Sequence, residues 1–390
     1  MTDTQKKPLW KNELVWLFLI TSGLFAILYS KFILGGYAYV FTDTGADTMQ
    51  INYAQYGLFS SLFRSGESGY VLQAGLGMDV SAYYPSYLIP YNLLILLAPQ
   101  RLLPWAVLAS AYLKMITISL VGYLFYRKLM QDGIGTMAAA LAWTFSGYVI
   151  LWGQHYGFCT CMALFTVFMY FLQCYLNGGE QRWKSAGLVI TVTMLLISSY
   201  YFLYMIAFFA VFYVFIYSIM QRYSMKRTAG KVAGLGGMGI LGVLIGGVAL
   251  VPIADTFLES ARAGVLAAKG TSHLLSPYKG KTLGTIVARF FSNHMLGIDK
   301  DYTGYLNYYE GMILAVSILT VFAVSYFIVK KSTRVKALVL TVFLVFLTIM
   351  PLTSRILVFT KHSYRWTFMI CFVEALVIGC FLQDVFREKN

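Results

Sequence analysis

Long apolar runs, separated by short polar segments, dominate the chain from residue 14 to residue 386. A helix that crosses a bilayer needs about 20 mainly apolar residues, and ten segments approach or exceed that length. The pattern predicts an all-α polytopic membrane protein, with one transmembrane domain over residues 1–390. The ten expected spans are residues 14–34, 102–126, 134–152, 159–176, 185–200, 201–220, 232–254, 310–329, 337–352 and 366–386.

Residues 185–220 form one apolar run of 36 residues, which needs a separate argument. As one straight helix this run would be about 54 Å long, whereas the hydrocarbon core of a bilayer is about 30 Å thick. Basic residues flank both sides, with Lys184 before the run and Arg222 after it. Because both flanks are expected on the same side, we predict two crossings with a tight outer turn near Ser198–Tyr201.

The basic residues also predict the orientation of the chain. Six short segments hold 17 of the 30 Lys and Arg residues, and outer segments of well over twice the total length hold 11. By the positive-inside rule, the short segments and both termini are cytoplasmic. We expect the first span to remain as an anchor, because no small-residue cleavage site follows it. The six segments are residues 1–13, 127–133, 177–184, 221–231, 330–336 and 387–390.

The composition supports the membrane interpretation and excludes several other classes of protein. Hydrophobic residues make up 59% of the chain and charged residues 12%, against about 25% charged residues in soluble domains. The net charge of +14 follows from the basic flanks of the spans, so we expect no nucleic-acid partner. The five cysteines all lie in apolar runs, which is typical of small core residues and not of a disulfide framework.

Two predicted outer loops, residues 35–101 and 255–309, are too long to be simple connections. Long loops on a rigid scaffold often carry function. Apolar residues recur at helical spacing over residues 48–63, which predicts a helix lying in the membrane interface. Glycines and prolines in residues 70–99 predict a loop, followed by an apolar helix of about 10 residues that is too short to span.

Asp43 and Asp47 lie just beyond the first span, in the stretch FTDTGADTMQ. They are four residues apart, so a helix would place both on one face. A carboxylate pair at the membrane surface can act as a base or hold a cation. The alternative is a structural role, in which Asp43 or Thr44 caps a helix and Gly45 forms the turn.

Basic residues at the predicted outer ends of the spans break the positive-inside trend, which indicates an anionic partner such as a phosphate head group. The alternative for these residues is ordinary contact with lipid phosphates. A histidine at the mouth of the third and fourth spans is either an interfacial hydrogen-bonding residue or part of the same site. The candidates are His155, Arg262, Lys361, His362 and Arg365.

Two further charged residues, Lys114 and Glu374, lie nearer the centres of predicted spans. A charge at this depth indicates either a functional site or a pair between helices.

Seven stretches together resemble the bacterial YfhO-type membrane protein family, within the GT-C class of multi-span glycosyltransferases. Each stretch alone is a weak signal, but they occur in order between residues 43 and 368, mostly at the outer ends of spans. The stretches are DTGADT, GLGMDV, YLIPYNLLILLAP, FSGYVILWGQHYGF, SSYYFLYM, LVPIADTFLESAR and SYRWTF.

The resemblance implies an enzyme in the bacterial cell membrane. It would move a sugar from a polyprenyl-phosphate carrier to a cell-envelope polymer, such as teichoic or lipoteichoic acid, on the outer face. GT-C enzymes keep an acidic residue in the first outer loop, which here corresponds to Asp43 or Asp47, and we favour Asp47. The reaction requires no cofactor, although it allows a divalent cation.

Two other functions fit the same sequence. A transporter or flippase of lipid-linked sugar would have a similar basic mouth, and it would need a charged path through the membrane. A non-catalytic subunit of an envelope-polymer assembly would share the membrane domain without the chemistry.

The predicted orientation can be tested on whole cells with an impermeant thiol reagent. A cysteine placed at Ser272, in the second outer loop, should react because that loop is expected outside. A cysteine placed at Thr333, in a predicted cytoplasmic segment, should not react. The reverse labelling pattern would invert the topology.

Overall fold

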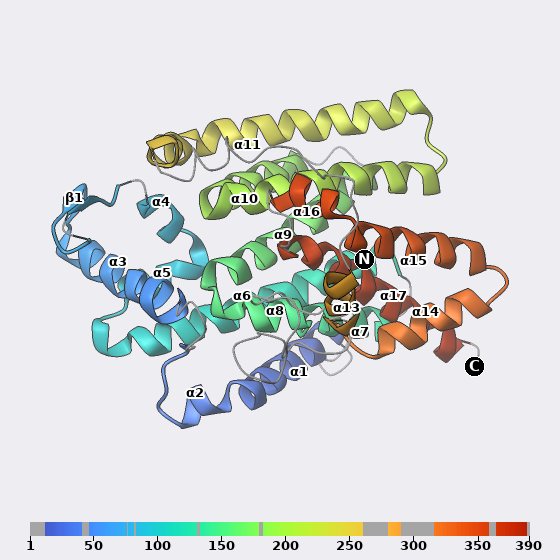
Figure 1. Cartoon of the computed structure of the whole chain (residues 1–390), viewed down its shortest axis with the longest axis horizontal. Helices are drawn as coiled ribbons and strands as arrows, with labels where there is room; N and C mark the ends of the chain where they lie inside the picture. Colours follow the sequence, from blue (N-terminus) through green and yellow to red (C-terminus); the bar gives the residue numbers. More distant parts are fainter. Residues whose placement is uncertain are drawn as a thin grey trace, which may run out of the picture.

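The computed structural model of the chain describes residues 12–40, 47–75, 77–81, 83–130, 133–178, 182–259, 280–289, 316–358 and 364–387. They form a helical bundle, with smaller elements at one end (Figure 1). The principal helices are α1 (Glu13–Leu28), α2 (Ser30–Leu34), α6 (Leu103–Arg127), α7 (Gly133–Thr144), α8 (Gly147–Leu151), α9 (Tyr156–Leu176), α10 (Arg182–Met220), α11 (Met225–Glu259), α14 (Leu319–Val329), α15 (Arg334–Ile349), α16 (Pro351–Val358) and α17 (Phe368–Arg387).

Within the described residues, six helical stretches are long and apolar enough to cross a membrane, and a bent pair makes a seventh if counted as one span. The all-α membrane class is therefore confirmed, whereas the count of ten spans stays a prediction. The six are Gln100–Arg127, Gly133–Gln154, Tyr156–Leu176, Arg182–Met220, Met225–Pro252 and Arg365–Arg387.

The central helices α6, α7, α9 and α17 are held by close packing and by hydrogen bonds between helices. Burial from water supplies little drive for association inside a bilayer, so these contacts carry more of the stability there. The Tyr126 hydroxyl of α6 donates to the Phe372 carbonyl of α17 at 2.9 Å. The Trp143 indole of α7 donates to the Thr166 hydroxyl of α9 at 2.8 Å. These bonds fix the rotation of each helix about its own axis.

The first predicted span, residues 14–34, is two consecutive helices, α1 and α2, with a break at Tyr29. Helix α1 is antiparallel to α6. The Thr21 hydroxyl lies 2.7 Å from that of Ser119, and the Ser22 hydroxyl lies 2.8 Å from that of Tyr112.

Helix α10 reverses direction at Ser199, whose backbone is extended (φ −172°, ψ 105°). The Lys184 amine, near its beginning, donates to the Gly178 carbonyl at 2.7 Å. The Tyr217 hydroxyl, near its end, donates to Asn177 at 2.9 Å. Both ends of α10 therefore lie beside the same end of α9, so its halves are antiparallel. This geometry agrees with the turn expected near Ser198–Tyr201.

The glycines of α11 allow close contact with the first half of α10. A Cβ atom at Gly242 would lie 2.7 Å from the Val192 side chain, and one at Gly246 would lie 2.8 Å from Leu196. Close packing of small residues against a neighbouring helix explains these two glycines.

Helices α15 and α16 are bent by 72° relative to each other, so the predicted span 337–352 ends earlier, at Ile349. Pro351 opens α16. Proline lacks a backbone N–H and disfavours helical backbone in the preceding residue, and Met350 is indeed extended.

The described part of the first long loop (residues 35–40, 47–75, 77–81 and 83–101) lies at the end of the bundle that carries α2 (Figure 1). The helix predicted over residues 48–63 is confirmed as a π-helix, η2 (Thr48–Tyr53), continued by α3 (Ala54–Ser65). The short apolar helix expected in residues 70–99 is α5 (Pro90–Leu97), which follows α4 (Tyr84–Tyr87). A two-stranded hairpin, β1 (Tyr70–Val71) with β2 (Met78–Asp79), was not expected.

The second long loop, residues 255–309, is described at residues 255–259, the end of α11, and in one helix, α13 (Gly280–Arg289). The rest of this loop lies outside the described residues.

Basic side chains gather beside aromatic rings at the opposite end of the bundle. The Lys231 amine lies 4.4 Å from the centre of the Tyr175 ring. At the same end, the Lys330 amine forms an ion pair with the Asp384 carboxylate at 2.9 Å. These residues belong to segments expected in the cytoplasm or to the adjoining helix ends. Their assignment to the cytoplasm stays a prediction of the positive-inside rule.

The contact between α7 and α17 gives a test of the packing. A Cβ atom at Gly379 would lie 2.7 Å from the backbone oxygen of Gly135, so Gly379→Ala should force the helices apart and destabilise the protein by about 1–3 kcal/mol. Gly239→Ala is the matched control, because its Cβ would meet nothing within 4 Å. Alanine there should be neutral or stabilise by up to about 1 kcal/mol. Thermal unfolding in detergent, followed by size-exclusion chromatography, measures both effects; equal midpoints would contradict the packing.

Candidate functional site

The turn that joins α8 to α9 presents three aromatic rings at a spacing of three residues. Ser146 caps α8, its side chain accepting from the Val149 N–H, and a short 3-10 helix, η4 (Trp152–Gln154), follows. The ring of His155 lies 5.2 Å, centre to centre, from both the Trp152 ring and the Phe158 ring. Trp152 and Phe158 lie 4.9 Å apart. We call this pair the aromatic platform.

Arg365 lies against the same platform. Its guanidinium carbon is 5.7 Å from the ring centre of Trp152 and 5.7 Å from that of Phe158, which is within the range of a cation–π contact. The Tyr148 hydroxyl donates to the Arg365 carbonyl at 2.5 Å, so the backbone is fixed independently of the side chain. The half-buried Arg365 therefore has a defined position next to His155.

Asp47 stands at the start of the π-helix η2, on the first long loop. Its side chain makes no capping hydrogen bond to this helix, and its carbonyl accepts from the Asn52 amide at 3.2 Å. The adjacent Thr48 hydroxyl donates to the Gln154 carbonyl at 3.4 Å. Asp47 precedes Thr48 and His155 follows Gln154, so each lies next to a residue of this hydrogen-bonded pair. π-Helices are rare and occur frequently at functional sites.

Buried tyrosines anchor the loop in this position. Tyr56 of α3 stacks on Tyr156 of α9 with ring centres 5.2 Å apart, and the Tyr156 hydroxyl donates to the Tyr39 carbonyl. Burial raises the pKa of the Tyr39 and Tyr56 phenols well above the usual value. Both phenols therefore stay neutral and do not compete with Asp47 as a base.

Lys114 lies directly behind the site. It is 2% exposed, and its amine donates to the Tyr156 carbonyl at 3.2 Å, one residue from His155. Glu374 lies elsewhere, in a cavity lined by residues of α14, α15 and α17. The two charges expected near span centres therefore occupy separate places in the bundle.

Of the sequence-predicted site residues, His155 and Arg365 both lie against the aromatic platform. Asp47 precedes Thr48, which bonds to Gln154 of η4, and its role as the base stays a prediction. The other four, Asp43, Arg262, Lys361 and His362, lie outside the described residues, so their roles stay predictions.

Sequence reasoning missed the aromatic platform and Tyr148, which position Arg365. The regular spacing of Trp152, His155 and Phe158 was the available signal.

Among the residues that the structure describes, no three His, Cys, Asp or Glu side chains gather in a way that could hold a metal ion. The candidate functional groups are one carboxylate (Asp47), one imidazole (His155) and one guanidinium (Arg365), of which the last two lie beside aromatic rings. Such a set can take a proton from a hydroxyl and bind a phosphate.

Comparison with protein families gives a match over nearly the whole chain. A family model described as "Bacterial membrane protein YfhO" matches residues 16–390, nearly the whole chain. The chain belongs to the YfhO family. Searches of curated proteins and of solved structures found no match to this YfhO-family chain. Family membership and the apolar helices together establish a multi-pass membrane protein, as the resemblance implied.

The role of Arg365 can be tested by binding of a polyprenyl phosphate to the purified protein in nanodiscs. Arg365→Ala should weaken binding by about tenfold or more, because a charge-assisted contact contributes about 1.5–3 kcal/mol. Arg365→Lys should also weaken it, because lysine keeps the charge and loses the planar fork that stacks and binds phosphate oxygens in pairs. Arg64→Ala, at an exposed position of α3, is the control. Unchanged binding in both Arg365 variants would indicate ordinary contact with lipid phosphates.

Proposed function

We propose that this YfhO-family protein is a membrane glycosyltransferase. It moves a sugar from a polyprenyl-phosphate carrier to a cell-envelope polymer, such as teichoic or lipoteichoic acid, on the outer face. The observation that carries the proposal is the hydrogen bond from Thr48, the neighbour of Asp47, to Gln154. Gln154 belongs to the turn that holds His155, and Arg365 lies against the Trp152 ring of the same turn. A candidate base and a candidate phosphate ligand thereby lie at one end of the bundle.

The proposed reaction is a direct displacement at the anomeric carbon of the sugar. Asp47 takes the proton of the acceptor hydroxyl, whose oxygen then bonds to the anomeric carbon. The bond between that carbon and the carrier oxygen breaks, and its electron pair leaves with the lipid phosphate. Arg365 stabilises the charge of the departing phosphate, and His155 orients or assists.

The environment of Arg365 supports a ligand that arrives at the membrane surface. The guanidinium lies beside two aromatic rings, and aromatic side chains also favour sugar and lipid interfaces because they have an apolar body. Buried Lys114 adds positive charge behind the site, which favours an anionic leaving group.

A transporter or flippase of lipid-linked sugar is the competing function. It would need charged groups that form a path through the membrane. The two ionisable side chains buried deep in the described bundle, Lys114 and Glu374, lie in separate places, which gives this alternative less support. A non-catalytic assembly subunit would share the platform but would not depend on Asp47.

Replacement of the candidate base separates the enzyme from its alternatives. Asp47→Asn keeps the shape of the side chain and removes the base, so sugar transfer should fall by about 10²–10⁴, while expression and carrier binding persist. Transfer can be measured in cells as sugar incorporated into the envelope polymer, with Asp43→Asn tested in parallel. Asp79→Asn is the matched control, since Asp79 is an exposed carboxylate in the same loop that accepts from the Ser81 N–H at 2.9 Å.

The comparison has clear outcomes. A loss in Asp47→Asn alone identifies the base, and a loss in Asp43→Asn alone transfers that role to Asp43. If both variants keep full sugar transfer, the assignment of the catalytic base is wrong and the flippase becomes the preferred function.

A further inference from the structure

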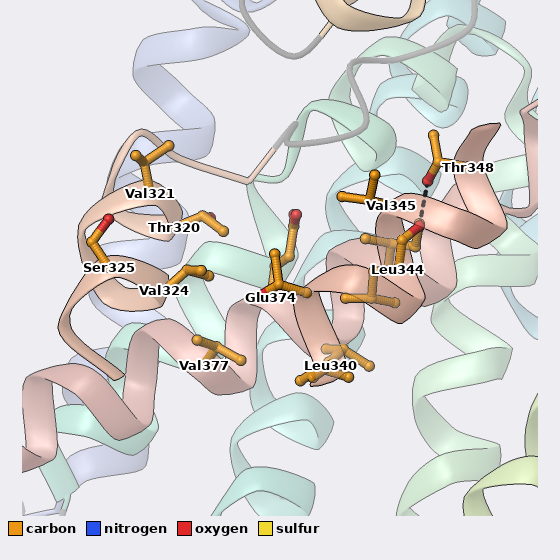
Figure 2. Close-up of a pocket in the computed structure, with 13 residues that line it drawn as sticks. Thr320, Val321, Val324, Ser325, Leu340, Leu344, Val345, Thr348, Glu374 and Val377 are labelled. Carbon is orange, nitrogen blue, oxygen red and sulfur yellow. Dashed lines mark hydrogen bonds between the residues drawn. The ribbon is translucent and has the colours of Figure 1, made fainter. Parts of the chain in front are cut away.

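A second candidate site lies within the membrane region, between α14, α15 and α17. Residues of these three helices line a cavity of about 270 Å³. Figure 2 shows Glu374 of α17 between the side chains from α14, such as Thr320, and those from α15, such as Leu344. Glu374 follows Arg365 by nine residues, or about 14 Å along a helix, so it lies near the middle of a bilayer core about 30 Å thick.

Two residues that line this cavity each have a buried oxygen atom without a hydrogen-bond partner among the described residues. They are Oε2 of Glu374 and Oγ1 of Thr320. Glu374 is 4% exposed and Thr320 is 2% exposed. The cavity also contains threonines that are satisfied within their own helix, since Thr341 donates to the Ala337 carbonyl at 2.7 Å. Buried polar groups without partners are costly and rare, so the two oxygens indicate a missing ligand.

The chemistry of the walls limits the class of ligand. Apart from the glutamate and four hydroxyl side chains, the lining is aliphatic. An isolated ionised carboxylate is very costly in such surroundings, so Glu374 is a neutral acid when the cavity is empty. A neutral acid both donates and accepts a hydrogen bond, and a hydroxyl group is its natural partner.

The rim of the cavity indicates where the ligand comes from. Val321, Leu340 and Val345 line it and are also 40%, 36% and 39% exposed, respectively. Exposed aliphatic residues at this depth face lipid, so the ligand enters from the bilayer. The volume of about 270 Å³ is many times the roughly 10–15 Å³ that a single water needs, so it accommodates a hydroxyl group with the first part of a hydrocarbon chain.

We propose that this cavity binds a neutral lipid alcohol. The hydroxyl exchanges hydrogen bonds with Glu374 and Thr320, and the chain lies along the aliphatic side chains of α14 and α15. The site differs from the proposed catalytic centre in place and in charge, because the ligand carries no phosphate and contacts no residue of the aromatic platform.

Direct binding tests the proposal with 1,2-dioleoylglycerol as the probe and the full chain in phosphatidylcholine nanodiscs. Thr320→Val removes the unpaired hydroxyl and should weaken binding by about three- to tenfold, as expected for one neutral hydrogen bond. Thr341→Val is the matched control in the same cavity and should bind as the unmodified chain does. Glu374→Leu should lose tenfold or more, and Glu374→Gln, which still donates and accepts, should lose less.

The methyl ether of the same lipid has no hydroxyl donor and should bind about three- to tenfold more weakly than the alcohol. Equal binding of alcohol and ether, or unchanged binding in both Thr320→Val and Glu374→Leu, would overturn the proposal and indicate an apolar cavity without specificity. Thermal unfolding of each variant identifies those that fail to fold.

A chemical measurement is independent of the variants. Dicyclohexylcarbodiimide reacts with protonated carboxyl groups that are reachable from lipid. It should label Glu374 and spare Asp384, which is paired with Lys330, and dioleoylglycerol should reduce the labelling several-fold. Absence of labelling at Glu374 would show that lipid does not reach the cavity, which would also overturn the proposal.

Discussion

Every backbone N–H and C=O group that lies in the hydrocarbon of a bilayer needs a partner within the protein. This constraint makes the bundle helical, and it also determines where the helices can be interrupted. Two interruptions concern the candidate functional site and its neighbour α16: one at His155 between η4 and α9, and one at Met350 between α15 and α16. The first lies beside the first long loop, where Thr48 donates to the Gln154 carbonyl. The second opens α16, to which Tyr204 and Trp366 bond. His155 and Arg365 lie beside such interruptions, where the backbone leaves the helix.

Aromatic side chains connect these interruptions into one site. The Trp366 indole donates to the Ser354 hydroxyl at 3.2 Å, which ties η5 (Arg365–Thr367) to α16. The Tyr148 hydroxyl donates to the backbone carbonyl of Arg365, the residue before Trp366. Tyrosines are suited to this position because each has an apolar ring for the membrane side and a hydroxyl for an exposed carbonyl. The 30 tyrosines of the chain thus include several that hold loops to helix ends.

The sequence predicted the features that depend on local pattern and failed for those that depend on distant contacts. The reversal at Ser199 followed from the length of the apolar run and its basic flanks, and the helix over residues 48–63 followed from its periodicity. Pro351 was a sequence signal for the bend, but it lies inside an apolar run, and that run led to the prediction of a span over residues 337–352. The contact between Thr48 and Gln154 joins positions 106 residues apart, and no local pattern encodes it. Likewise, Arg365 was a candidate by charge, but its place on the aromatic platform depends on packing between α9 and η5.

The reversal of α10 affects the side of the membrane on which each later segment of the chain lies. A segment that crosses a membrane and returns adds an even number of passes, so the chain leaves it on the side where it entered. If Ser199 were helical and the run crossed once, α11 to α17 would be inverted relative to the membrane. Arg365 would then lie on the opposite face from Asp47. If both halves of α10 cross the membrane, as predicted, the extended residue Ser199 thus keeps Arg365 on the same face as Asp47.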